Sequence, residues 1–421
     1  MKAVKRIQNL DATVQIPGSK SYTQRALIIA SLGEGKSFLR NPLIAEDTRH
    51  LIKALCALGA RIVVADNDII VTETAGKIMN PGKPLFLGNN GTAMRFLTTL
   101  VSLGRGDFII DGNNRLRERP IQPLLDALKT LGVYCRSMDG KGRLPVTIRG
   151  GGINGGKVIF TDTESSQYIS SLLIASPHAR NDVDIELRGL TVSRPYIDMT
   201  IAVMNHFGVK VIRKGTNEYT VKAPQKYTGQ RYLIEGDASS ASYFFVAAAI
   251  CKGRVKVDNV SPKTVQGDID FLKLLETVGC HVDRGSDSIS VTGSELHRGT
   301  MEFDMANMPD MVPSLAILSA FRPGQTVIKN VSHLRLKESD RLEALVTELN
   351  KIGIDAKELS DGLVINGGTP HGADIETYDD HRIAMSFAIA GLVTEGIKIK
   401  NHGCVKKSFP GFWNELDRLL L

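Results

Sequence analysis

The segment SYTQRALIIASLGEGKSFLRN, residues 21–41, decides the fold because its pattern occurs six times along the chain. It consists of an apolar helix rich in small residues, then a glycine or polar break, then a β-rich run. Further copies begin at Gly91, Ser166, Ser239, Asp310 and His381. The copies are roughly 70 to 75 residues apart, a period longer than that of the common solenoid repeats. The chain is therefore built from six repeated units.

A second kind of segment alternates with the first: an amphipathic helix that ends near a glycine and is followed by two strands. Its apolar residues recur at i, i+3 and i+4, which predicts a helix. Glycine tolerates the positive φ of a helix C-cap, and the glycines at these helix ends are Gly59, Gly132, Gly208, Gly279 and Gly353. Each complete unit is thus predicted to be βαβαββ.

The two chain ends are expected to complete one unit together. A sixth amphipathic helix, WNELDRLLL (413–421), ends the chain without strands, whereas AVKRIQNLDATVQIPG (3–18) has strand character without a helix. Six units divide into two similar α/β domains of three units each. We expect a discontinuous domain of residues 1–17 plus 236–421 and a continuous domain of residues 18–235, with crossings near 17–18 and 234–240.

Composition restricts the class of protein. The chain has 421 residues, of which 42% are apolar and 23% are charged, as in soluble proteins with full cores. Its five cysteines lie far apart without CxxC spacing, which favours neither a disulfide framework nor a zinc site. The absence of a secretory h-region and of a long apolar run predicts a cytoplasmic protein that contacts no membrane. The net charge of +7 favours acidic partners, while the sparse aromatics argue against a nucleic-acid platform.

Cations recur where helices are predicted to start. A cation is unfavourable at the positive end of a helix unless an anion is bound there too. The cations at these positions are Lys20, Arg119, Lys337, Arg341, Arg382 and Lys407. This recurrence predicts that both domains direct cations and helix dipoles into a shared cleft. The ligand is expected to carry several negative charges, as phosphate and carboxylate groups.

Polar residues of other kinds accompany these cations. We interpret Asp237, Ser239 and Ser240 as ordinary N-caps. Asp340 and Asp380 are expected to orient arginines. For Asp310 and Glu338 two roles remain open, because a carboxylate near bound anions can either orient arginines or act as a general acid or base.

Several motifs together resemble the 5-enolpyruvylshikimate-3-phosphate synthase family over essentially the whole chain. They include PGSKSYTQRAL (17–27), LGNNGTAMR (87–95), SRPYID (193–198), LRLKESDR (334–341) and DDHR (379–382). The resemblance implies two domains, each an inside-out α/β barrel of three βαβαββ units, with the active site in the cleft between them. It also implies a reaction without metal or organic cofactor, in which shikimate 3-phosphate and phosphoenolpyruvate give 5-enolpyruvylshikimate 3-phosphate and phosphate through a tetrahedral intermediate.

The resemblance also implies roles for individual residues. The expected phosphoenolpyruvate site comprises Lys20, Asn89, Gly91, Arg119, Gln167, Arg341, Arg382 and Lys407. The expected shikimate 3-phosphate site comprises Ser21, Arg25, Ser165, Ser166, Gln167, Ser193, Tyr196, Asp310, His333 and Lys337. Asp310 is expected to act as the base at the 5-hydroxyl, while Glu338, with Lys20 nearby, handles the methylene proton.

Three positions depart from the family pattern: Asn90 stands where Ala is common, Phe96 where Pro is common, and His333 where Asn is common. Phe96 is expected to tilt its helix slightly. Gly91 argues for inhibition by glyphosate, because a methyl group there would crowd the pocket. We further expect a monomer whose domains close on the substrates.

Three alternatives are disfavoured by particular residues. UDP-N-acetylglucosamine enolpyruvyl transferase typically has Asn after the first Lys and a Cys before its RP, whereas here Ser21 follows Lys20 and GNNRLRERP (112–120) has no Cys. A nucleic-acid or polyanion binder would spread its cations over one face rather than set them beside carboxylates. A catalytically inactive homologue would not need the full set of charged residues.

Overall fold

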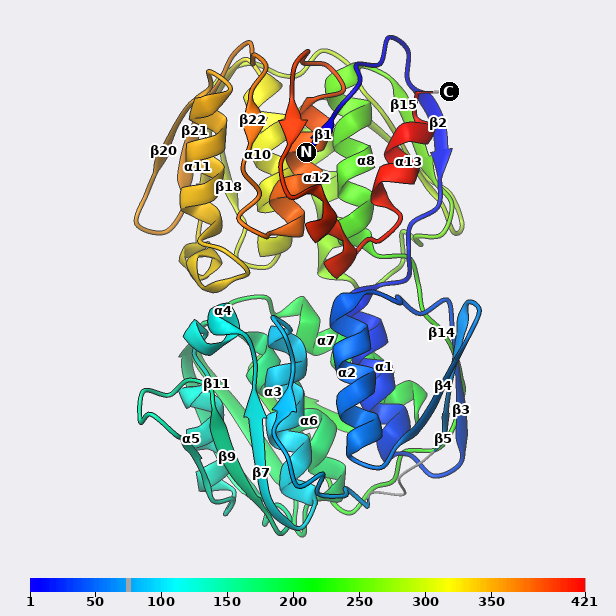
Figure 1. Cartoon of the computed structure of the whole chain (residues 1–421), viewed down its shortest axis with the longest axis vertical. Coiled ribbons are helices and arrows are strands. Elements are labelled where there is room, and N and C mark those ends of the chain that lie inside the picture. Colours follow the sequence, from blue (N-terminus) through cyan, green and yellow to red (C-terminus); the bar gives the residue numbers. More distant parts are fainter. Residues whose placement is uncertain (73–76, 421) are drawn as a thin grey trace. The chain divides into compact units, whose positions relative to one another are not determined.

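A computed structural model describes residues 1–72 and 77–420 (Figure 1). The chain divides into two compact units, one made of residues 18–234 and the other of residues 1–17 with 235–421. We call these the middle unit and the end unit. The chain crosses between them after Pro17 and after Ile234. Glu235 belongs to the end unit, one residue before the predicted boundary.

The small-residue helices form the interior of each unit. They are α1 (Lys20–Leu32), α3 (Gly91–Leu100) and α6 (Ser166–Ala175) in the middle unit, and α8 (Ala238–Cys251), α10 (Val312–Phe321) and α12 (His381–Ala390) in the end unit. Nearly all of their residues are buried. Such helices are apolar on all sides because other elements surround them.

Hydrogen bonds between these helices repeat with the period of the sequence. Thr99 Oγ1 of α3 lies 2.8 Å from Ser171 Oγ of α6, and Ser242 Oγ of α8 lies 2.7 Å from Ser314 Oγ of α10. Both pairs are separated by 72 residues. Equivalent positions in neighbouring units are therefore in contact, as expected if the units are true structural repeats.

The amphipathic helices are α2 (Glu46–Ala57), α5 (Gln122–Thr130), α7 (Pro195–His206), α9 (Phe271–Thr277), α11 (Arg341–Lys351) and α13 (Phe412–Arg418). The first five end as predicted, because Gly59, Gly132, Gly208, Gly279 and Gly353 have φ values from 82° to 108°. The predicted last helix is shorter than expected and ends at Arg418, and Leu421 lies outside the described residues.

The predicted βαβαββ pattern is complete in three units. The sheet of β6 (Leu85–Phe86), β7 (Gly106–Asp111), β8 (Cys135–Ser137) and β9 (Val146–Gly150) has the order β6-β7-β9-β8. Its first two strands are parallel and its other pairs are antiparallel. The same order occurs in β10 (Gly156–Thr163), β11 (Val183–Thr191), β12 (Val211–Lys214) and β13 (Glu218–Val221), and in β18 (Met301–Asp304), β19 (Gly324–Lys329), β20 (Asp355–Glu358) and β21 (Leu363–Gly367).

In two further units the parallel edge strand comes from a distant part of the chain. β14 (Arg231–Leu233) pairs with β3 (Lys36–Arg40), whose sheet continues with β5 (Asp68–Thr72) and β4 (Arg61–Ala65). β2 (Asp11–Val14) pairs with β15 (Arg254–Val257), whose sheet continues with β17 (Ile289–Thr292) and β16 (His281–Arg284).

The N-terminal strands do not both join the last unit. β1 (Lys2–Ala3) does so, pairing with β23 (Lys398–Ile399), which also pairs with β22 (Asp374–Ile375). For β2 the expectation is wrong. β14, the strand that directly precedes α8, is paired with β3, so the edge of β15 is open to another strand. β2 occupies it and buries Val14 beside its partner Val257.

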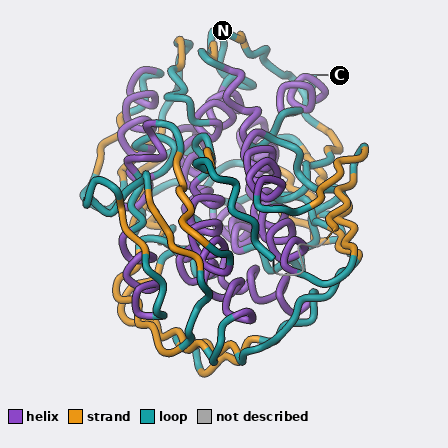
Figure 2. Tube along the Cα trace, turned by 60° about the horizontal axis from the view of Figure 1, so that its bottom comes forward, coloured by secondary structure: helices purple, strands orange, loops and turns teal. Residues whose placement is uncertain are grey.

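Within each unit the strands lie outside the small-residue helices (Figures 1 and 2). β7 illustrates how a sheet covers this core, because Phe108 and Ile110 are buried while Ile109 between them is partly exposed. Period-two alternation of this kind is typical of a sheet with one solvated face. No helix in the described ranges combines the length and the apolar character that a membrane span requires.

Candidate active site

The predicted site residues fall into two groups, one in each unit. The middle cluster contains Lys20, Ser21, Arg25, Asn89, Gly91, Arg119, Ser165, Ser166, Gln167, Ser193 and Tyr196. The end cluster contains Asp310, His333, Lys337, Glu338, Arg341, Arg382 and Lys407.

In the middle cluster a guanidinium lies against the start of α3. A Cβ atom added to Gly91, the first residue of α3, would stand 2.6 Å from Arg119 Cζ and 2.6 Å from Arg119 Nη1. Only glycine leaves room for this approach. The positive end of the helix and the cation are therefore adjacent, an arrangement that a bound anion stabilises.

Arg119 reaches this position from a place in the chain that differs from the prediction. It is the C-cap of α4 (Asn114–Glu118), and α5 begins only at Gln122. Lys337 and Lys407 likewise stand at the ends of short 3₁₀ helices, η5 (Ser332–Leu336) and η6 (His402–Lys407). A cation is favourable at a helix C-terminus, so for these three residues the predicted position at a helix start is wrong.

The remaining cations do occupy first turns. Lys20 is the first residue of α1 and Arg341 the first of α11, while Arg382 is the second residue of α12. Lys20 Nζ lies 3.2 Å from Asp47 Oδ2 at the start of α2. A carboxylate from a neighbouring helix thus offsets part of the positive charge at the start of α1.

Gln167 joins the start of α6 to the start of α3. Its Nε2 donates to Thr92 Oγ1 at 3.0 Å, and its Oε1 accepts from Arg95 Nη1 at 3.0 Å. Arg95 Nη1 also donates to the Gly91 carbonyl at 3.1 Å. Ser165, the N-cap of α6, accepts from the Gln167 N–H at 3.3 Å. The two helix starts are held together by polar side chains without an intervening carboxylate.

Arg25 is a buried cation whose hydrogen-bond acceptors are all neutral. It donates to Thr200 Oγ1 at 2.8 Å, to the Ser21 carbonyl at 3.0 Å and to the Tyr196 carbonyl at 3.2 Å. Its Cζ lies 5.3 Å from the ring centre of Phe96 and 5.8 Å from that of Tyr196. Burial lowers the pKa of Arg25 to about 10. A buried cation of this kind favours an anionic ligand.

Two of the predicted site residues in the middle cluster are serines that do not cap a helix. Ser166, the first residue of α6, and Ser193, which precedes α7, are both buried. Ser193 has φ 59°, the left-handed region that few non-glycine residues adopt. Strained backbone at a buried hydroxyl is a feature often found at functional sites.

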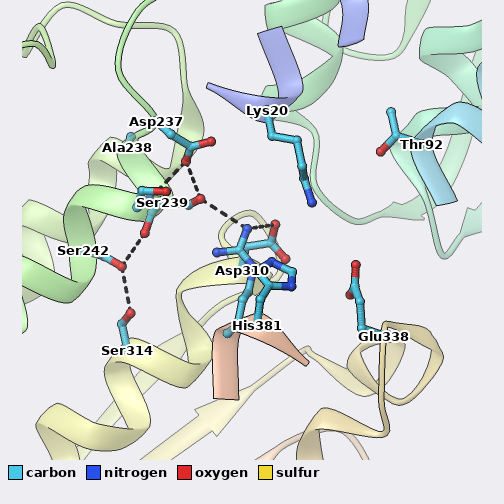
Figure 3. Close-up of polar contacts among 12 residues, drawn as sticks. Lys20, Thr92, Asp237, Ala238, Ser239, Ser242, Asp310, Ser314, Glu338 and His381 are labelled. Atoms are coloured by element: carbon cyan, nitrogen blue, oxygen red, sulfur yellow. Dashed lines mark hydrogen bonds and ion pairs between the residues drawn. The ribbon is translucent and has the colours of Figure 1, made fainter. Parts of the chain in front are cut away.

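In the end cluster, Asp310 bridges two arginines. Its Oδ1 accepts from Arg341 Nη1 at 3.0 Å and its Oδ2 accepts from Arg382 Nη2 at 2.7 Å. Arg341 Nη2 also donates to Glu338 Oε2 at 2.8 Å. Figure 3 shows Asp310 and Glu338 of this cluster. Burial by itself lowers the pKa of Arg341, but the carboxylates of Asp380, Glu338 and Asp310 outweigh it and raise that pKa above its ordinary value.

The roles predicted for Asp340 and Asp380 are confirmed. Asp380 is fully buried, accepts from Arg341 Nε at 2.8 Å and caps α12 through the Arg382 N–H at 2.9 Å. Asp340 accepts from Arg335 Nη1 at 3.1 Å and caps α11 through the N–H groups of its first turn. Each carboxylate both orients an arginine and caps the N-terminus of a helix.

The start of α8 agrees only in part with the prediction. Asp237 is its N-cap and accepts from the Ser240 N–H at 3.1 Å. Ser239 is instead part of a chain of hydrogen bonds, because its hydroxyl donates to Asp237 and accepts from Arg382 Nη2 at 3.2 Å (Figure 3). Tyr243, one turn further along α8, accepts from Arg382 Nη1 at 3.3 Å. Sequence reasoning missed both contacts.

His333 is a neutral histidine within this charged cluster. It is 6% exposed, and its Nε2 has no hydrogen-bond partner among the described residues. Burial, with a smaller contribution from Lys337, lowers the pKa of His333 to about 3. The ring therefore remains uncharged at neutral pH and can donate or accept a single hydrogen bond at Nε2.

Neither cluster has the composition of a metal centre. Within residues 1–72 and 77–420, no group of three or more His, Cys, Asp and Glu side chains is arranged to hold a metal ion. The polar groups are mainly guanidinium, ammonium, amide and hydroxyl groups, which are donors to oxyanions.

The fold and the clusters define a class: α/β proteins of repeated βαβαββ units that hold cations and helix starts ready for a ligand with several negative charges. Comparison with known proteins gives the family. The family model for EPSP synthase (3-phosphoshikimate 1-carboxyvinyltransferase) matches residues 4–416. The chain belongs to the EPSP synthase family, as the resemblance in its motifs indicated.

Individual relatives are similar over their whole length. A 3-phosphoshikimate 1-carboxyvinyltransferase of Syntrophobacter fumaroxidans is 42% identical over 99% of both chains. One of Nostoc punctiforme is 41% identical over 98% of this chain and 97% of its own. The solved structure of EPSP synthase from Acinetobacter baumannii superposes with a TM-score of 0.83 at 27% identity, over 99% of this chain and 97% of that one. The predicted fold class is thereby confirmed.

Proposed function

We propose that this protein is a 3-phosphoshikimate 1-carboxyvinyltransferase of the shikimate pathway, which supplies aromatic amino acid biosynthesis. It transfers the enolpyruvyl group of phosphoenolpyruvate to the 5-hydroxyl of shikimate 3-phosphate and releases phosphate. The observation that carries the proposal is the end cluster, where Asp310 is held between Arg341 and Arg382 beside Glu338. Its two arginines suit a carboxylate and its two acids suit proton transfer.

The proposed phosphoenolpyruvate site uses both clusters. Lys20, Arg119, Gln167 and Lys407 bind its phosphate, with Asn89 and Gly91 lining the pocket. Arg341 and Arg382 bind its carboxylate through the fork of guanidinium donors, a geometry that lysine cannot reproduce. The approach of Arg119 to the start of α3 supports this assignment, because a phosphate there would contact the guanidinium and the helix N–H groups together.

The proposed shikimate 3-phosphate site lies mainly in the middle cluster. Ser165, Ser166, Gln167 and Ser193 bind the 3-phosphate, and Ser21 and Arg25 bind the ring carboxylate, with Tyr196 packed nearby. The neutral hydrogen-bond acceptors of Arg25 support this role, since the shikimate carboxylate would supply the negative counter-charge that this buried guanidinium lacks. Asp310, His333 and Lys337 contact the ring hydroxyls from the end cluster.

The proposed chemistry is addition followed by elimination. Asp310 accepts the proton of the 5-hydroxyl as the hydroxyl oxygen bonds to C2 of phosphoenolpyruvate. Glu338, assisted by Lys20, gives a proton to C3. The tetrahedral intermediate then loses phosphate from C2 and a proton from C3, which restores the double bond. The surrounding cations stabilise the charges that develop, without a metal or organic cofactor.

The proposal extends to the molecule and its surroundings. Both clusters contribute groups to the active site, because each supplies only part of what the reaction requires. The enzyme acts as a monomer in the cytoplasm, consistent with its five free cysteines. Glyphosate inhibits it at the phosphoenolpyruvate site.

The test is phosphate release by the purified protein with phosphoenolpyruvate and either shikimate 3-phosphate or UDP-N-acetylglucosamine. Phosphate release is expected with shikimate 3-phosphate as the acceptor and not with UDP-N-acetylglucosamine. It should be abolished in Asp310→Asn and Lys20→Met. No release with either acceptor would refute the proposal. Release only with the nucleotide sugar would assign the chain to the sister reaction.

A further inference from the structure

Asn90 lies between Asn89 and Gly91 and has no role in the proposed reaction. It is 1% exposed and forms the N-cap of α3. Its Oδ1 accepts from the Ala93 N–H at 2.9 Å. This bond satisfies one of the unpaired donors in the first turn, which is the ordinary function of an N-cap.

The other end of the same amide connects α3 to two further helices. Asn90 Nδ2 donates to Gln24 Oε1 of α1 at 2.9 Å and to the Asp47 carbonyl of α2 at 2.7 Å. Both amide protons and the amide oxygen are therefore used. Neither alanine nor serine could replace all three bonds, because alanine has no polar atom and a serine hydroxyl has only one proton.

Gln24 shows that the contact matters to the packing. It is fully buried in an apolar helix, where a polar side chain is costly without a hydrogen bond. Its Nε2 has no hydrogen-bond partner among the described residues, so its bond to Asn90 is made through Oε1 alone. The orientation of this buried amide is thus determined by Asn90.

The second bond leads to a charged residue of the candidate site. Asp47 offers its carbonyl to Asn90, and its Oδ2 lies 3.2 Å from Lys20 Nζ. On the other side, Asn90 is bonded in the chain to Gly91, over which Arg119 lies. One buried amide therefore connects the partner of Lys20 with the helix start that faces Arg119.

We propose that Asn90 is a positioning residue for the phosphoenolpyruvate site: it fixes Lys20, through Asp47, relative to the start of α3. The polar side-chain atoms of Asn90 are all bonded within the protein, so it acts through Asp47 rather than on the substrate. The inference rests on the proposed function, because it assigns the phosphate of phosphoenolpyruvate to Lys20, Arg119 and the start of α3. This role would explain why the chain has Asn rather than the more common Ala at position 90.

Two variants separate capping from bridging. Asn90→Ser keeps an N-cap acceptor but loses both donor bonds, whereas Asn90→Ala loses all three. If Asn90 positions Lys20, both variants raise KM for phosphoenolpyruvate about five- to tenfold, the effect of one ordinary hydrogen bond. The dissociation constant of shikimate 3-phosphate, measured by titration calorimetry without phosphoenolpyruvate, stays unchanged. Asn90→Ala also lowers Tm more than Asn90→Ser does.

Thr98→Val provides a matched control on the same helix. Thr98 is fully buried, and its hydroxyl donates to the Met94 carbonyl within α3 and to no other group of the described residues. This variant should change Tm without raising KM for phosphoenolpyruvate. A rise in KM in Thr98→Val equal to that in Asn90→Ser would show that any loosening of α3 has this effect, and would overturn the proposal.

The remaining outcomes are also decisive. A normal KM in Asn90→Ser with a raised KM in Asn90→Ala would reduce Asn90 to an N-cap, and so refute the bridging role. If KM for phosphoenolpyruvate and the dissociation constant of shikimate 3-phosphate rise together, Asn90 supports the fold in general and the proposal fails. Absence of shikimate 3-phosphate-dependent phosphate release by the unmodified protein would instead refute the proposed function, which keeps the two failures distinct.

Discussion

Gly91 leaves no room for a side chain beside Arg119 in the candidate site. Its missing side chain admits Arg119 to the start of α3, where an added Cβ would lie 2.6 Å from the guanidinium. A contact this short is not found for real side chains, so a methyl group displaces Arg119 or the ligand next to it.

Gly91→Ala is therefore expected to raise KM for phosphoenolpyruvate by about tenfold or more, equivalent to about 1.4 kcal/mol or more of lost binding. The inhibition constant of glyphosate should rise with it. Steady-state kinetics measures both quantities. Gly151→Ala is the control, because apart from its chain neighbours no described residue has an atom within 4 Å of the added Cβ and its φ lies outside the left-handed region. Unchanged kinetics in Gly91→Ala would show that Arg119 is not a phosphate ligand.

His333 gives a prediction about pH, because burial and Lys337 lower its pKa to about 3 in the folded protein. An unfolded histidine titrates near pH 6.5, so between that pH and about pH 3 the unfolded state binds a proton that the folded state does not bind. Its contribution to stability is complete above about pH 6.5 and is lost as the pH falls toward 3, by up to about 1.4 kcal/mol per pH unit.

Replacing His333 by Asn should remove this contribution. The free energy of unfolding of His333→Asn, measured in urea between pH 7.5 and 4.5, is expected to fall less steeply than that of the unmodified protein. The groups elsewhere in the protein that titrate in this range are common to both proteins and cancel in the difference. Parallel pH profiles would show that His333 is already solvated or protonated in the folded state.

At the scale of elements, the same type of residue stabilises two neighbouring helices to different extents. Asp340 caps α11 and Asp380 caps α12, but the side chain of Asp340 is 28% exposed whereas that of Asp380 is fully buried. Asp380 is moreover the buried partner of Arg341 Nε. Burial decides how much a lost cap costs, because an unpaired charge in the interior cannot be solvated.

Asp340→Ala is expected to cost about 1 kcal/mol of unfolding free energy, the usual value of a lost N-cap. Asp380→Ala is expected to cost about 3–5 kcal/mol, because it removes the buried carboxylate that accepts from both Nε and Nη2 of Arg341. Urea denaturation of the two variants gives this comparison. Equal losses would contradict the assignment of Asp380 as the structural partner of Arg341.

At the scale of the whole molecule, the middle unit is continuous in sequence and supplies its own edge strands. Its first sheet is completed by β14, residues 231–233, which lies before the second crossing of the chain. Its core is formed within residues 18–234. We therefore expect the fragment 18–234 to fold by itself.

This fragment should show one cooperative urea transition by circular dichroism. The matched fragment 18–229 lacks β14 and leaves β3 with an open edge, which destabilises a sheet and favours association. It is expected to unfold at lower urea concentration or to aggregate. If both fragments are unfolded, the middle unit depends on the end unit for its stability, contrary to the prediction.

Local patterns in the sequence determined the elements and most of the candidate site. The period of the small-residue helices predicted the repeated units, and five glycines predicted five helix ends, because capping depends on residues within one turn. The roles of Asp340 and Asp380 were likewise evident, since an N-cap and its helix are adjacent in the chain. The motifs also identified the family. Capping signals act over three or four residues and do not depend on tertiary contacts.

Only the tertiary structure decided which distant segments meet. It paired β2 with β15 rather than with the last unit, laid Arg119 from the end of α4 over the start of α3, and brought Ser239 to Arg382. It also joined Asn90 to Gln24 and Asp47. Strand edges and buried polar groups have many possible partners of equal local propensity. The partner is selected by the packing of whole units, which no short stretch of sequence encodes.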